Sequence, residues 1–88
     1  MNYEVRLSNR AARDLDRLGR ESLERVVRRL EQLAQAPYNP RFSNRLTNRG
    51  ELRKSRVCGW RIIFFVDEAG RAVEVVTVER RGQVYRRI

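Results

Sequence analysis

A change in the spacing of apolar residues near the middle of this chain constrains the possible folds more than any other feature. After a short opening segment and up to about residue 36, the apolar residues recur every three or four positions, which is typical of amphipathic helices packed on a core. From Glu51 onward they recur at every second position, which indicates β-strands. A helical part followed by a strand-rich part predicts an α+β domain.

The helical part predicts a short strand and then two antiparallel helices. Residues 3–7 alternate between apolar and charged side chains, and Ser8 is placed to cap the helix that follows. We expect Gly19 to end the first helix in the left-handed conformation. Pro37 and Pro40 end the second helix and open a polar loop that runs to about Gly50. The second helix carries one apolar stripe, formed by Leu23, Val26, Val27, Leu30, Leu33 and Ala34.

The second half predicts three consecutive strands, over residues 51–57, 60–66 and 72–79. Cys58 and Gly59 form the first turn, and residues 67–70 form the second, with Gly70 at a position that we expect to have positive φ. The order is then β-α-α-β-β-β, with the helical hairpin packed on an antiparallel-rich sheet. Eighty-eight residues bury a small core, so we expect a single domain over residues 1–88.

Composition narrows the classes of function that remain. The chain has 20 Lys plus Arg against 11 Asp plus Glu, a net charge of +9, which favours nucleic acid, an anionic surface or an acidic protein as partner. A surface that is merely rich in solvated arginine is the alternative explanation. Histidine is absent and Cys58 is the only cysteine, so we expect no disulfide, no metal site and no cofactor. Without a signal-like or membrane-spanning apolar run, the expected location is the cytoplasm.

Part of the positive charge lies within the predicted strands. By alternation Lys54 and Arg56 share one face with Leu52, whereas Arg53 lies on the other face. The Trp60, Ile62, Phe64 and Val66 face of the next strand is the better candidate to cover the helices, so Arg61 should face away from them. Alternation does not fix the register between these strands, and a slip of one residue would separate Lys54 from Arg61.

Several short motifs follow one another along the chain: Ser8-Asn9-Arg10-Ala11-Ala12, Gly59-Trp60-Arg61-Ile62-Ile63-Phe64, Val76-Thr77-Val78, Arg80-Arg81 and Val84-Tyr85. In this order and spacing they resemble the RelE branch of the RelE/ParE superfamily of bacterial toxin–antitoxin pairs, and the resemblance covers the whole chain. The resemblance implies a RelE-like fold, which is similar to that of microbial ribonucleases, and a toxin that cuts messenger RNA, in the best-known members at the ribosomal A site. It also implies a cognate antitoxin, mRNA and the ribosome as partners, and no membrane.

The resemblance implies four catalytic residues, Lys54, Arg61, Arg81 and Tyr85. In an attack by the RNA's own 2′-OH, Lys54 would be the base if the surrounding arginines favour its neutral form. Arg61 and Arg81 would bind the phosphate, and Tyr85 would stack on a base or orient the 2′-OH. Each also has a structural alternative, such as Tyr85 fixing the C-terminus on the core. Further arginines are candidates to bind RNA, namely Arg45, Arg49, Arg53, Arg56 and Arg80.

One position departs from the family pattern, because Leu52 stands where some active members have another lysine. This departure leaves the identity of the base open, and either Arg80 or Arg81 could be the functional arginine. Two other functions therefore stay open as alternatives. One is a ParE-like toxin that inhibits DNA gyrase without catalysis, and the other is a basic domain that binds RNA or the ribosome without cutting.

Overall fold

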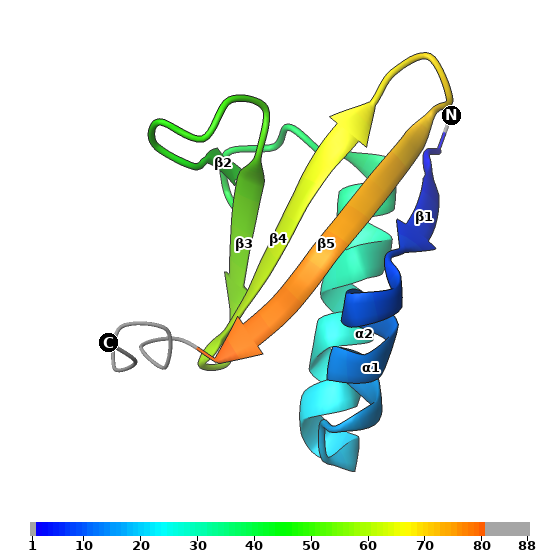
Figure 1. The fold of residues 1–88 in the computed structure, drawn as a ribbon, viewed down its shortest axis with the longest axis vertical. Coiled ribbons are helices and arrows are strands. Elements are labelled where there is room, and N and C mark those ends of the chain that lie inside the picture. Colours follow the sequence, from blue (N-terminus) through cyan, green and yellow to red (C-terminus); the bar gives the residue numbers. More distant parts are fainter. Residues whose placement is uncertain (1, 81–88) are drawn as a thin grey trace.

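The computed structural model describes residues 2–80, in which two helices cover one face of a five-stranded sheet (Figure 1). Chain order begins with β1 (Glu4–Leu7), α1 (Asn9–Asp16) and α2 (Arg20–Gln35). It continues with β2 (Asn44–Arg45), β3 (Arg53–Val57), β4 (Trp60–Asp67) and β5 (Ala72–Arg80). The strands lie in the order β1-β5-β4-β3-β2, and only the β1–β5 pair is parallel. The predicted α+β architecture is confirmed.

The core lies between the sheet and the helices. The helices contribute Ala11, Val26, Leu30 and Leu33, and the strands contribute Ile62, Phe64, Val73, Val75 and Val78. Trp60 and Val66 pack against this cluster, so the face of β4 that was expected to meet the helices does so. Because alternate strand residues point to opposite faces, Arg61 lies on the face opposite the helices, as expected.

Two predicted features of the helical part have different outcomes. The Ser8 hydroxyl accepts a hydrogen bond from the Ala11 N–H at 2.9 Å, which confirms the helix cap. The prediction for Gly19 is wrong, because its φ is −70° and it lies at the N-cap of α2 rather than in a left-handed turn. The first helix instead ends at Arg17, which keeps right-handed φ and ψ and whose N–H bonds to carbonyls of α1.

The two hairpin turns also differ from each other. Cys58 and Gly59 have φ of 47° and 81°, which is the pattern of a two-residue turn with both central residues left-handed. The positive φ expected at Gly70 occurs at Arg71 instead, with φ of 51°. A Cβ at Gly70 would lie 2.7 Å from Oδ2 of Asp67, so a side chain there would require the Asp67 carboxylate to shift.

The loop after α2 was expected to be a polar connection, but it contains a short strand. Its residues Asn44 and Arg45 form the short strand β2, which pairs with Lys54 and Arg53 of β3. This strand was not expected, because two residues are too few to show a periodic pattern. The pairing brings an arginine-rich loop to the edge of β3. In residues 2–80 no helix is long and apolar enough to cross a membrane.

Candidate active site

The face of the sheet opposite the helices, here named the outer face, carries a row of charged residues across three strands. The register places Arg56 of β3 opposite Arg61 of β4, and Arg61 opposite Glu79 of β5. In the next row Lys54 lies opposite Ile63, so Lys54 and Arg61 are diagonal neighbours on this face. The register, which alternation alone left open, therefore places Lys54 near Arg61.

Glu79 pairs directly with Arg61. Both Nε and Nη2 of Arg61 donate to Oε2 of Glu79, the first at 3.0 Å. Each side chain is only 19% exposed, so this ion pair is screened less than a surface pair. Like charges directly opposite each other destabilise a sheet, and Glu79 offsets that repulsion between Arg56 and Arg61.

A groove with a volume of about 390 Å³ runs along the edge of the outer face. Lys54 and Arg56 line it from β3, while the preceding loop and β2 contribute Arg41, Phe42, Asn44 and Arg45. Lys54 is the only lysine of the chain, in which the other basic residues are arginines. The groove therefore combines several positive charges with one aromatic ring, which are the side chains that bind phosphates and bases of single-stranded nucleic acid.

Arg29 of α2 holds the edge of β3 that borders this groove. Its Nη1 donates to the Ser55 hydroxyl at 2.9 Å and to the Arg56 carbonyl at 2.8 Å. Its guanidinium also lies over the Phe42 ring, 5.3 Å from the centroid. One helix side chain thus fixes the backbone at Arg56 and one face of the groove's aromatic ring.

The structure brings some of the proposed residues together and separates others. Lys54, Arg56 and Arg61 share the outer face, and Arg45 lies beside them in the groove. Arg53 is on the helix side of the sheet, where its Nε donates to the Ser43 hydroxyl at 2.8 Å. Arg80 is also on that side, stacked over Trp60 at 5.1 Å from the ring centroid.

The remaining proposed residues are not part of this group. Arg49 is exposed in the loop before β3 and lines neither pocket described here. Arg81 and Tyr85 lie outside the described residues. Leu52 precedes the first residue of β3, which begins at Arg53 rather than at residue 51 as predicted.

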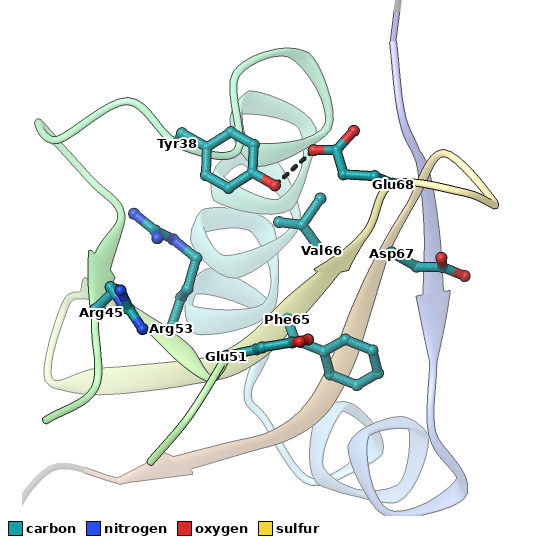
Figure 2. Close-up of a pocket in the computed structure, with 8 residues that line it drawn as sticks. All are labelled: Tyr38, Arg45, Glu51, Arg53, Phe65, Val66, Asp67 and Glu68. Carbon is teal, nitrogen blue, oxygen red and sulfur yellow. Dashed lines mark hydrogen bonds between the residues drawn. The ribbon is translucent and has the colours of Figure 1, made fainter. Parts of the chain in front are cut away.

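A second pocket, of about 500 Å³, lies where β4 extends beyond β3 (Figure 2). Arg45 and Arg53 line one side of it, and the Tyr38 hydroxyl donates to Oε2 of Glu68 at its rim. This hydrogen bond raises the pKa of Tyr38 to about 12. Hydrogen bonds from Tyr38 and then from Tyr3 lower the pKa of Glu68. Acidic and basic side chains both line this pocket, whereas the charged side chains of the groove beside Lys54 are all basic.

Sequence reasoning missed two features of the site. Phe42 and its neighbours in the loop gave no periodic signal, and only the β2–β3 pairing places them beside Lys54. Alternation places Glu79 only at the end of a strand, and the β4–β5 register is needed to place it beside Arg61. Among residues 2–80 no group of three His, Cys, Asp or Glu side chains could hold a metal ion.

The comparisons with known proteins agree on one class. The family model described as the ParE toxin of the type II toxin–antitoxin system parDE matches residues 5–85. No curated protein sequence matches the chain.

Solved structures of toxins have the same fold. A chain of the RelBE2 toxin–antitoxin complex from Mycobacterium tuberculosis is 25% identical, with a TM-score of 0.81 over 94% of this chain and 95% of that one. The isolated Escherichia coli RelE toxin is 23% identical, with a TM-score of 0.79 over 94% and 90%. A chain of the chromosomal ParDE system from Pseudomonas aeruginosa is 17% identical, with a TM-score of 0.66 over 89% and 95%.

Proposed function

The chain belongs to the ParE toxin family of type II toxin–antitoxin systems, within the RelE/ParE superfamily, and from that premise we propose that it is an endoribonuclease that cuts messenger RNA. The cut would be made without a metal ion, by attack of the 2′-OH on the adjacent phosphate, and on mRNA held in the ribosomal A site. Loss of intact messages would stop translation and growth.

The observation that carries this proposal is the clustering of Lys54, Arg56 and Arg61 on the outer face, next to a basic groove with an aromatic ring. In the transition state of the cleavage, negative charge builds up on the phosphate oxygens. Cations held in fixed positions stabilise that charge better than mobile ones. Strand residues provide such fixed positions. Arg81 and Tyr85 complete the proposed catalytic set, and Arg45 and Arg56 would bind the RNA backbone.

A cognate antitoxin is the proposed protein partner. The solved structures of similar fold include toxin–antitoxin complexes of RelE with RelB. The net charge of +9 favours an acidic segment, which would fold on binding and cover the basic face. Such a segment would neutralise the charges that the proposed cleavage requires.

A second candidate function is inhibition of DNA gyrase without catalysis, because the matching family model is described as a ParE toxin. The structural comparison favours the first candidate, since the TM-score is 0.79 for RelE and 0.66 for the ParDE chain. A gyrase inhibitor has no need of a lysine and two arginines arranged on one face of a sheet.

The test is expression of the protein in bacteria, with primer extension on cellular mRNA within minutes of induction. We expect primer extension to stop at new 5′ ends, and the matching upstream fragments to carry a 2′,3′-cyclic phosphate or 3′-phosphate. We expect Arg61→Ala and Lys54→Ala to abolish both. Lys54→Ala leaves the Arg61–Glu79 pair intact, so it separates loss of chemistry from loss of folding. Arg28→Ala, which removes an exposed arginine of α2, is the matched control and should cut normally.

Three other outcomes would contradict the proposal. DNA damage signalling with intact messages would indicate gyrase inhibition. Reduced translation with intact messages would indicate binding to the ribosome without cutting. Normal cutting by both Lys54→Ala and Arg61→Ala would place the site elsewhere on the molecule.

A further inference from the structure

We propose that Glu79 is the general base of this site, a role that rests on the proposed nuclease function. Its substrate would be the 2′-OH of the nucleotide whose phosphate is bound by Arg61. Glu79 comes from β5, at the end of the charged row that crosses the outer face from Arg56 through Arg61.

The proposed cleavage needs a proton acceptor on the outer face. Attack by a 2′-OH needs an acceptor for its proton, and ammonium and guanidinium groups have no lone pair with which to accept one. An ionised carboxylate accepts protons directly. The arginines and the lysine of the outer face therefore suit phosphate binding, and the Glu79 carboxylate, which pairs with Arg61, suits proton removal.

Glu79 is held in the position that this role requires. Two donors of Arg61 fix its Oε2, which leaves Oε1 outside these two bonds. The side chain is 19% exposed, so it is packed yet reachable from the outer face. The proposed function assigns the phosphate to the same Arg61 that binds Glu79, so a phosphate bound there would lie beside the carboxylate.

Another carboxylate of the same strand does not fit. Glu74 also lies on the outer face, opposite Phe65, and its Oε2 accepts from Nη1 of Arg6 at 3.1 Å. It is five positions from Glu79, or roughly 16 Å along an extended strand, and so lies far from Arg61. Glu74 therefore resembles Glu79 because it lies on the same strand and face and also pairs with an arginine. It differs because it lies far from Lys54, Arg56 and Arg61.

The proposed step moves one proton at each end of the reaction. The 2′-OH gives its proton to Glu79 while the 2′-oxygen forms a bond to phosphorus. The bond from phosphorus to the 5′-oxygen breaks, and that oxygen takes a proton from the Lys54 ammonium. The products are a 2′,3′-cyclic phosphate and a 5′-hydroxyl. Arg56 and Arg61 stabilise the charge that gathers on the phosphate oxygens.

The test compares Glu79→Gln with Glu74→Gln in the full-length purified protein on ribosomes programmed with mRNA. We expect Glu79→Gln to slow single-turnover cleavage by about 100-fold or more, which is the usual size of a general-base effect, and Glu74→Gln to leave the rate within about twofold. The affinity for mRNA with a 2′-deoxy nucleotide at the cut site should stay similar in both variants, because Glu79 acts on the 2′-OH.

A second variant covers the case in which Glu79→Gln fails to fold. Glu79→Asp keeps the charge and can still pair with Arg61, but it withdraws the carboxylate by about one bond length, or ~1.5 Å. A displacement of that size should slow cleavage by about 100-fold while the thermal unfolding temperature stays near that of the wild type.

The outcomes separate this role from the proposed function. If the wild type cuts and Glu79→Gln or Glu79→Asp cuts equally fast, the base is another group and only the role of Glu79 is wrong. Faster cleavage by Glu79→Gln would mean that Glu79 restrains Arg61, which also overturns the role. If the wild type cuts no RNA, the nuclease function is wrong and the role of Glu79 falls with it.

Discussion

Arg29→Ala should destabilise the fold strongly, although Arg29 is a charged helix residue that is only half-buried. The substitution removes the two hydrogen bonds from Nη1 to Ser55 and to the Arg56 carbonyl, and the stacking on Phe42. Ser55 is only 2% exposed, so water cannot readily replace the lost donor. The edge of β3 would then lose its connection to α2.

The magnitude follows from these contacts. A hydrogen bond that involves a charged group contributes about 1.5–3 kcal/mol, and two acceptors of one guanidinium share part of that energy. The contact with the aromatic ring adds about 0.5–1 kcal/mol. We expect Arg29→Ala to lower the free energy of unfolding by about 2–4 kcal/mol, which for a domain of this size is a fall in Tm of roughly 10–25 °C.

The assay is urea denaturation followed by circular dichroism, with thermal unfolding as a second measurement. Arg28→Ala is the matched control, because it removes an exposed arginine one position away and should change the free energy of unfolding by less than about 0.5 kcal/mol. Arg29→Lys should recover less than half of the loss, because an ammonium lacks the planar fork of donors. A loss below about 1 kcal/mol in Arg29→Ala, or full recovery in Arg29→Lys, would refute the reasoning.

Three further predictions concern the turn, the groove and the second pocket. Because Cys58 has φ of 47° before Gly59, Cys58→Asn should raise the free energy of unfolding by about 0.5–1 kcal/mol, and unchanged urea denaturation would contradict this. Phe42→Leu should weaken binding of a single-stranded oligoribonucleotide by about tenfold in fluorescence anisotropy, and an unchanged Kd would mean that no base stacks there. The hydrogen bond from Tyr38 lowers the pKa of Glu68, so the ionised carboxylate stabilises the fold above the ordinary value of 4.5, and that stabilisation is lost as the pH falls through the lower folded pKa. Glu68→Gln should therefore be less stable than the wild type at neutral pH, and the difference should shrink in acid; an equal difference at both pH values would contradict the assignment.

The sequence was sufficient for the helices, for the strands other than β2 and for the faces of the long strands. Each long strand was expected to within two residues, because alternation of apolar and polar side chains is a strong local signal. The glycines were less informative, since neither Gly19, which begins a helix, nor Gly70 has the positive φ that was expected. A glycine permits several conformations, so its presence alone does not select one.

The site was only partly accessible from the sequence. The turn at Cys58 and Gly59 has two residues, and such a turn fixes the pairing of Arg56 with Arg61. The register between β4 and β5 shifts between Ile63 and Phe64, and the alternation of apolar and polar residues does not predict this irregularity. The position of Glu79 beside Arg61 depends on this register.

By itself, the sequence determined the helical and strand-forming segments, the side of the sheet that meets the helices, and a basic chain without histidine. Only the tertiary structure decided that Arg80 lies away from Lys54 and Arg61, that β2 brings Phe42 to the groove, and that Glu79 pairs with Arg61. The physical reason is the separation along the sequence of the residues that interact. Periodicity depends on neighbours along the chain, whereas register, edge pairing and ion pairs depend on segments that meet only when the core has formed.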